Sequence, residues 1–252
     1  MNWLVVLVAI LLGCGGNSEV VTLYQISDHG ITITASSRLA GAIESITYEG
    51  KEFLIANDHG RGLQSATSYD YKGESYNPTE AGSSADLFSS ESTSKLIAIR
   101  KVGALETQTQ MAFWLPVGEK VLSDHVLFKR VEIIGPNTIQ YDVQFYVPRD
   151  YSHGCLEILT GYMPPGFNTF LTVGGVEVSH GPGEIREPLI FTDGTHAMGI
   201  YTEWVNSYGR FNCIETMKWN SVYRKENIKA GYYGFRSYVY VGRLEDVQGR
   251  MR

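Results

Sequence analysis

The chain has 252 residues, with 27 acidic side chains against 21 Lys and Arg, and its formal net charge at neutral pH is −6. Because phosphate contacts depend on clustered Lys and Arg, and the basic residues here are scattered, we expect no nucleic-acid partner. The length is ample for one large hydrophobic core, and all-β sandwiches of this size are often single domains.

The first residues resemble an export signal. Residues 4–12, LVVLVAILL, form an apolar run that is shorter than the roughly 20 residues needed to span a bilayer and that suits the apolar region of a signal peptide. The stretch LLGCGG at 11–16 resembles a lipobox, in which the Cys becomes the lipidated first residue. We therefore expect a signal peptide over 1–13, and a lipidated Cys14 with its tether over 14–20.

These features predict an exported lipoprotein of the cell envelope that meets the membrane only through its lipid anchor. The first three residues, MNW, lack the basic residue that a signal peptide usually carries. An ordinary cleaved signal with a chance Cys, and hence a secreted protein, is the alternative.

Strand patterns fill most of the remaining chain. Alternating runs or hairpins with Gly-containing turns occur at residues 31–36, 42–57, 95–115, 125–147, 187–204 and 234–244. In the fourth of these, the alternation places five apolar side chains, from Ile139 to Val147, on one face. The sequence shows neither a long amphipathic helix nor a fixed-period repeat. The pattern predicts an all-β fold, a single large antiparallel β-sandwich over residues 21–252.

Three stretches interrupt the strand rhythm, at residues 57–88, 147–166 and 174–187. They are too aromatic and too low in net charge to indicate disorder. Long irregular segments inside a compact domain are often functional. We therefore expect a ligand site to lie on them.

The Cys and His residues form no metal motif. None of the six His has HxH or HExxH spacing, and the three Cys form no CxxC, so we expect no metal and no cofactor. If Cys14 is lipidated, Cys155 and Cys213 remain, and an exported pair predicts a disulfide. Two buried free thiols are the alternative.

The strongest candidates for catalysis lie in the first irregular stretch. Arg61 lies between two glycines, which let the backbone approach a ligand closely, and its guanidinium suits a carboxylate or vicinal hydroxyls. His59 shares the face of Arg61 if the segment is extended, and an imidazole is the side-chain type suited to acid–base chemistry near neutral pH. Glu80 follows a Pro-stiffened turn and could act as a general acid or base. We predict His59, Arg61 and Glu80 as catalytic residues.

A structural role is the alternative for each of these residues. Arg61 could pair with Asp58 or Glu80 to fix a loop, and Glu80 could be a turn carboxylate. Other polar and aromatic residues of the irregular stretches would orient a sugar, because aromatic rings pack on its C–H faces and Tyr adds a hydroxyl. The predicted substrate-binding residues are Asn57, Gln64, Tyr69, Tyr76, Asn77 and Tyr162.

Several motifs resemble a known group of proteins. The stretches GAIESITYEGKEFLIANDHGRGLQSA, YNPTEAGS, LTGYMPPGF and YYGFRSYVYVGRLEDV resemble uncharacterised secreted bacterial β-sandwich proteins, which are similar to the galactose mutarotase-like supersandwich proteins that act on carbohydrates. The resemblance implies a supersandwich-like fold and a polysaccharide or oligosaccharide partner. Asn57 and Arg61 could match the Asn/Arg pair of sugar mutarotases. The chain has no stretch similar to their NGPNxLHGG, so mutarotase activity is not implied.

We therefore expect an exported carbohydrate-active protein that binds and cleaves a polysaccharide. Hydrolysis needs two carboxylates, whereas a lyase needs a Tyr or His base with a cation beside the uronate, and the first irregular stretch contains both sets of residue types. A non-catalytic glycan-binding surface lipoprotein is the alternative function. A structural envelope protein is a third.

Overall fold

The computed structural model describes residues 20–115, 121–179, 182–212 and 216–251. The predicted signal peptide, Cys14, most of the tether and Cys213 lie outside these residues. Within the described ranges, antiparallel strands make up nearly all of the regular structure, and one continuous set of pairings links 18 of them. No helix in these ranges is long and apolar enough to cross a membrane.

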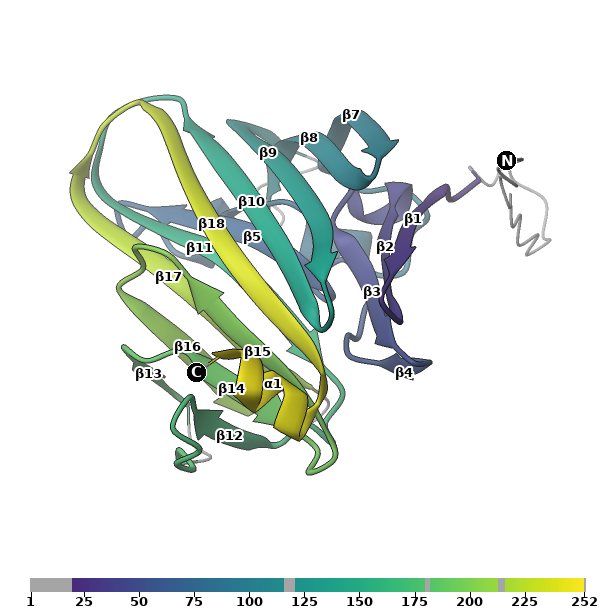
Figure 1. Cartoon of the computed structure of the whole chain (residues 1–252). Coiled ribbons are helices and arrows are strands. Elements are labelled where there is room, and N and C mark those ends of the chain that lie inside the picture. The colour runs from purple at the N-terminus through teal and green to yellow at the C-terminus, as the bar shows by residue number, and fades with distance from the viewer. Residues whose placement is uncertain (1–19, 116–120, 180–181, 213–215, 252) are drawn as a thin grey trace.

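The pairings fold into two stacked layers (Figure 1). The front layer, which faces the viewer in Figure 1, contains in spatial order β7 (Lys95–Val102), β8 (Ala104–Phe113), β9 (Leu122–Gly135), β10 (Thr138–Val147), β18 (Gly231–Arg243), β15 (His196–Thr202), β14 (Leu189–Thr192) and β12 (Thr169–Thr172). The back layer contains β1 (Leu23–Asp28), β2 (Ile31–Ser36), β3 (Ile43–Tyr48), β5 (Leu63–Tyr69), β11 (Tyr151–Met163), β17 (Met217–Ile228), β16 (Ser207–Asn212) and β13 (Gly183–Ile185).

Short elements complete the fold. The two-residue strand β6 (Pro78–Thr79) pairs with β5 on one side and with β8 on the other, so it joins the two layers. The hairpin partner of β3 is β4 (Lys51–Glu52). Three short 3-10 turns lie at η1 (Ser37–Leu39), η2 (Glu74–Tyr76) and η3 (Ser84–Asp86). The C-terminal helix α1 (Leu244–Met251) packs on the outer face of the front layer, where Val247 contacts β14 and β15.

The core lies between the layers. The alternation in β10 turns Tyr141, Val143 and Phe145 inward, as the sequence predicts, and these side chains are buried. Phe191 of β14 stacks on Trp219 of β17, with ring centroids 5.7 Å apart, and so connects the layers across the core. Burying each large apolar side chain contributes about 1.5–3 kcal/mol. The predicted antiparallel β-sandwich is confirmed.

Two predicted irregular stretches contain strands of the back layer. Residues 57–88 include β5, and most of residues 147–166 form β11, a 13-residue strand between β5 and β17. A register shift near Glu157 places both Ile158 and Leu159 in the interior, which breaks the alternation that marks a strand in the sequence. The sequence pattern does not reveal this strand because the strand is bulged and central.

The predicted disulfide involves a residue that the structure does not describe. Cys213 lies outside the described residues, so the Cys155–Cys213 bond stays a prediction. Cys155 itself lies in β11, and among the described residues its thiol is free. Burial is the main cause that raises the pKa of this thiol.

Candidate functional site

The predicted catalytic residue Glu80 is part of an interior ion pair. Its carboxylate accepts a hydrogen bond from the Ser65 backbone at 3.0 Å and pairs with Nζ of Lys129, and neither charged side chain is exposed. Lys129 also donates to the Gly41 carbonyl at 2.7 Å. Burial lowers the pKa of Lys129, and the Glu80 charge opposes this shift. Glu80 therefore ties the two layers together and cannot touch a ligand, which corrects the predicted catalytic role.

His59 is also interior. Its Nδ1 lies 2.8 Å from the Leu87 carbonyl, and its backbone N–H donates to the same oxygen. Among the described residues Nε2 has no hydrogen-bond partner, and the side chain is fully buried. His59 therefore fastens the η3 region to the start of the stretch, and the predicted trio with Arg61 and Glu80 does not assemble at a surface.

Most of the predicted sugar-binding residues have structural contacts. Gln64 is buried and accepts a hydrogen bond from the Ala81 backbone at 3.0 Å. Tyr69 is buried between His125 and Tyr151, with ring centroids 4.8 and 4.1 Å away. Tyr76 is exposed, and its ring makes an edge contact with the ring of Phe113. The backbone carbonyl of Asn77 accepts a hydrogen bond from the backbone N–H of Trp114. Asn57 is exposed.

Arg61 and Tyr162 are brought together, although a hundred residues separate them. The Arg61 guanidinium carbon lies 5.3 Å from the centroid of the Tyr162 ring, a cation–π distance. Nε of Arg61 lies 3.5 Å from Asp58, and Nη1 donates to Thr216 at 3.3 Å. These contacts hold the guanidinium over the ring with about a quarter of its side chain exposed. The structural alternative of an Arg61–Asp58 pair is thus present as well.

Two further residues extend this pair into a cluster. Lys218 pairs with Tyr162 across β11 and β17, and its Nζ lies 5.8 Å from the Tyr162 ring. The same Nζ lies 5.3 Å from the ring of Phe211, which pairs with Lys218 across β16 and β17. We call Arg61, Tyr162, Lys218 and Phe211 the basic-aromatic cluster. It lies on the outer face of the back layer, because the neighbours Met163 and Trp219 point into the core.

Polar groups continue this face beside the cluster. Asn220 is two residues from Lys218 on the same strand, only 4% exposed, and its Oδ1 has no hydrogen-bond partner among the described residues. The neighbouring Thr160 pairs with Asn220 and is bonded to the Glu157 carboxylate. A buried amide oxygen without a partner is costly, so Asn220 is a strained polar position directly beside the cluster.

The electrostatics of the cluster favour donors over bases. Burial raises the pKa of the Tyr162 phenol, and the charges of Lys218 and Arg61 oppose this shift without reversing it. The phenol therefore keeps its proton at neutral pH and can donate it in a hydrogen bond. Two cations and a phenol on one face suit a carboxylate. Across the described ranges, no group of three or more His, Cys, Asp and Glu side chains is arranged to hold a metal ion.

Comparisons with known proteins bear on the fold. No protein-family model matches the chain, and no curated protein matches it. A galactose mutarotase related enzyme from Lactobacillus acidophilus superposes with a TM-score of 0.53 at 7% identity, over 88% of this chain and 97% of that one. A galactose mutarotase-like protein from Clostridium acetobutylicum gives 0.50 at 5% identity, over 89% and 98%. The chain has the galactose mutarotase-like fold.

This fold also occurs within larger proteins. The 4-alpha-glucanotransferase of Thermococcus litoralis matches with a TM-score of 0.56 at 9% identity, over 89% of this chain and 38% of that one. At such identities the likeness shows the fold alone. The predicted resemblance to the mutarotase-like supersandwich is confirmed, and the fold is one found in carbohydrate-active proteins.

The sequence does not predict Lys218 and Phe211 as site residues, because only the pairing of β11, β17 and β16 places them beside Tyr162.

Proposed function

We propose that the protein binds an acidic carbohydrate, an oligosaccharide or polysaccharide bearing carboxylates, at the basic-aromatic cluster. The observation that carries this proposal is the placement of Arg61 and Lys218 over the ring of Tyr162. The mutarotase-like fold supports a carbohydrate as the class of ligand.

The contacts define what each residue would do. The planar guanidinium of Arg61 is fixed by Asp58 and Thr216, so a sugar carboxylate would meet a donor fork that is already oriented. Lys218 adds a second positive charge, and the Tyr162 phenol donates to a carboxylate or ring hydroxyl.

Binding is better supported than cleavage. Hydrolysis needs a pair of accessible carboxylates about 5–10 Å apart, and Glu80 is buried against Lys129. A lyase needs a base beside the uronate, and burial keeps the Tyr162 phenol protonated. Non-catalytic glycan binding is therefore the function that we propose first, and hydrolase or lyase activity is the alternative.

The test compares one polymer with and without its charge. Polygalacturonate should bind in calorimetry, and the fully methyl-esterified polymer should bind at least about tenfold more weakly. Arg61→Ala should lose about tenfold in affinity, while Lys101→Ala, a change at an exposed lysine of β7, should lose none. Equal binding of the two polymers would refute the carboxylate site. New reducing ends, or ultraviolet absorbance from an unsaturated product, would establish cleavage instead.

We also propose that the protein is exported and lipid-anchored, with the lipid on Cys14. The apolar run at residues 4–12 followed by LLGCGG supports this location. When the protein is produced in a bacterium, labelled fatty acid should enter the wild type and fail to enter Cys14→Ser. Equal labelling of both would exclude lipidation at Cys14.

A further inference from the structure

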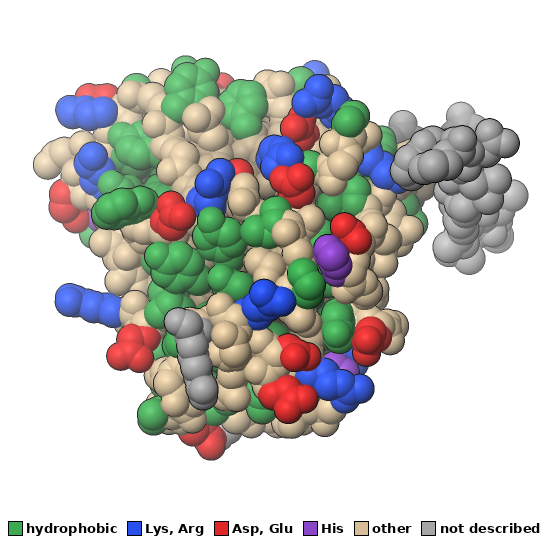
Figure 2. Space-filling view, in the orientation of Figure 1, with side chains coloured by type: hydrophobic (Ala, Val, Ile, Leu, Met, Phe, Trp, Pro, Cys, Tyr) green, Lys and Arg blue, Asp and Glu red, His purple; other side chains and the backbone are tan. Residues whose placement is uncertain are grey.

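A groove of about 560 Å³ lies on the outer face of the front layer, where β7, β8, β9 and β10 run side by side. It is on the opposite side of the core from the basic-aromatic cluster. Figure 2 views this face and shows hydrophobic side chains gathered among interspersed basic and acidic ones. The groove follows from alternation, because every second side chain of β8, β9 and β10 points away from the core.

A row of charged side chains crosses five strands of this face, and four of its five members line the groove. The strand registers place its members directly opposite one another, with alternating sign, in the order Arg100, Glu106, Arg130, Asp142 and Arg236. We call these five residues the charge row. Neighbouring strands lie about 4.8 Å apart, so the row is about 19 Å long.

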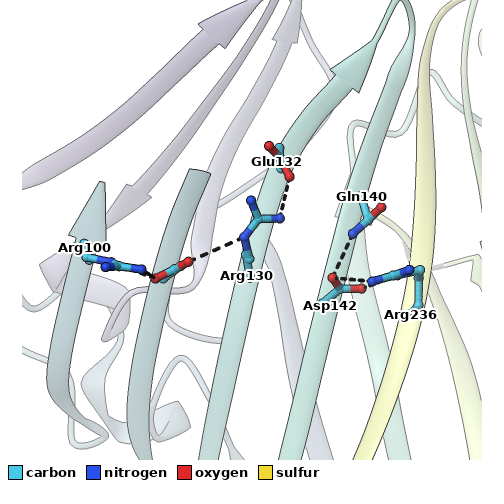
Figure 3. Close-up of polar contacts among 7 residues, drawn as sticks. Arg100, Arg130, Glu132, Gln140, Asp142 and Arg236 are labelled. Atoms are coloured by element: carbon cyan, nitrogen blue, oxygen red, sulfur yellow. Dashed lines mark hydrogen bonds and ion pairs between the residues drawn. The ribbon is translucent and has the colours of Figure 1, made fainter. Parts of the chain in front are cut away.

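At both ends of the row, the arginine forms hydrogen-bonded ion pairs with the neighbouring carboxylate (Figure 3). Arg100 donates to Oε2 of Glu106 from Nε at 2.8 Å and from Nη2 at 2.6 Å. Arg236 donates two hydrogen bonds to the Asp142 carboxylate, at 2.7 and 3.0 Å, and Gln140 donates to the same carboxylate at 2.8 Å.

The middle of the row is balanced in charge. Nε of Arg130 lies 3.5 Å from Glu106, and Nη1 of Arg130 pairs with Glu132. With Glu132 included, three guanidinium groups face three carboxylates, so this set of outward-facing side chains has no net charge. Each group remains partly exposed, with between 28% and 69% of each side chain accessible. Their remaining donors and acceptors are therefore open to an uncharged ligand.

An uncharged row runs beside the charge row. Two residues further along the strands, Gln108, Phe128, Gln144 and Gly234 lie opposite one another. A Cβ atom at Gly234 would meet nothing closer than 4.0 Å, the distance of the Gln144 amide nitrogen and of the Val143 carbonyl oxygen. The absence of a side chain at Gly234 leaves open space on the sheet surface between Arg236 and Tyr232, which we call the hollow and which lies beside the groove.

Aromatic rings border the hollow. Tyr232 is 62% exposed, and its ring centroid lies 5.2 Å from that of Tyr146 and 6.2 Å from that of Phe128. On the far side of the charge row, Tyr201 and Tyr238 stack at 6.3 Å. Tyr and Phe rings pack on the C–H faces of sugar rings, and paired Arg and carboxylate groups offer donors and acceptors to vicinal hydroxyls.

Cross-strand ion pairs have a simpler use. They stabilise a sheet modestly, and that role alone would explain the alternating signs. It does not explain why the row is flanked by amides, a glycine hollow and exposed rings. We propose that this groove, with the hollow beside it, binds a neutral oligosaccharide chain that lies across the strands. The charge row forms hydrogen bonds with the hydroxyls of the chain, and the ring of Tyr232 packs on one sugar face.

This site is independent of Arg61. The test therefore uses neutral ligands, namely cellohexaose, xylohexaose, mannohexaose and maltohexaose, titrated into the folded protein by calorimetry. We expect at least one to bind with a Kd below about 1 mM. Gly234→Ile should weaken it by about tenfold or more by filling the hollow, and a β-branched residue suits an exposed strand position, so the melting temperature should not fall.

Matched variants distinguish binding in this groove from binding elsewhere on the surface. Tyr232→Ala should also lose affinity, whereas Tyr71→Ala, at another exposed tyrosine, and Arg61→Ala should not. The proposal is overturned if none of the four hexasaccharides binds, or if Gly234→Ile leaves binding unchanged. It is overturned equally if Tyr232→Ala abolishes a concentration-dependent dimer seen in sedimentation, because the face would then be covered by a second copy of the chain.

Discussion

At the scale of single residues, Glu80 and Lys129 place full charges between the two layers with neither side chain exposed. Taking each ion out of water costs several kcal/mol, and only the pairing and the added hydrogen bonds offset that cost. Removing one partner leaves the other buried and alone. We therefore expect Glu80→Gln to lower the free energy of unfolding by about 3–5 kcal/mol in urea titrations.

The partner variants make this prediction specific. Lys129→Met should cost a similar amount, and the double variant Glu80→Gln/Lys129→Met should recover much of the loss, because no lone charge remains. Strictly additive losses would show that the pair itself is not the source. Folded Glu80→Gln should still bind polygalacturonate, and a loss of binding would restore a direct role for Glu80.

The buried side chain of His125 should make the stability of the protein depend on pH. Burial, with a smaller contribution from Arg149, lowers its pKa from 6.5 to about 4. Between these values the unfolded chain binds a proton at His125 that the folded chain does not bind. The free energy of unfolding should therefore fall as the pH is lowered from 6.5 to 4, by about 3 kcal/mol from this residue.

A variant isolates the contribution of His125. His125→Phe keeps a ring against Tyr69 and cannot titrate. Its stability relative to the wild type should rise as the pH falls through this window, as measured by urea unfolding at neutral pH and near pH 4. A constant difference between the two proteins would show that His125 is protonated normally in the folded state.

At the scale of the element, one turn sets the start of β5 and so the position of Arg61. Gly62 has φ of +84°, and a Cβ there would lie 2.6 Å from the Ile43 carbonyl oxygen. Gly50 has nearly the same φ, +85°, in open space. Gly50→Ala should cost about 1 kcal/mol for the dihedral angle alone. Gly62→Ala should cost clearly more and weaken polygalacturonate binding; equal losses in thermal unfolding would contradict the steric argument.

The elements show what a sequence can predict. β9 and β10 follow from clean alternation and a Gly-containing turn, both local signals. β11 does not, because its bulge places Ile158 and Leu159 inside together. Lys129 does carry a signal, since it stands at an inward position between two buried apolar residues of β9. A lysine at such a position requires a buried partner, which is the structural role of Glu80.

The candidate site is only partly predictable for a related reason. Arg61 and Tyr162 have the residue types of a sugar contact, and the sequence predicts both. Their meeting depends on β5, β11 and β17 becoming neighbours, which are long-range pairings that local patterns do not encode. Lys218 and Phe211 join the cluster through the same pairings.

At the scale of the whole molecule, the two layers turn two different outer faces to solvent. The back layer presents two cations around Tyr162, and the front layer presents a balanced charge row beside exposed rings. Stacked sheets lie about 10 Å apart, and the space between these two is filled with close-packed side chains. A ligand on one face therefore has no direct contact with a ligand on the other.

This separation predicts that both ligands bind at once. With polygalacturonate saturating the basic-aromatic cluster, the Kd of the neutral hexasaccharide should change by less than about twofold, because coupling between sites requires a shared two-state element. Calorimetry with and without the polymer measures the change in this Kd. Arg61→Ala is the control, because this variant should not bind the polymer at the basic-aromatic cluster. Competition between the two ligands in the wild type, lost in Arg61→Ala, would show that they share one face and that the two-sided arrangement is wrong.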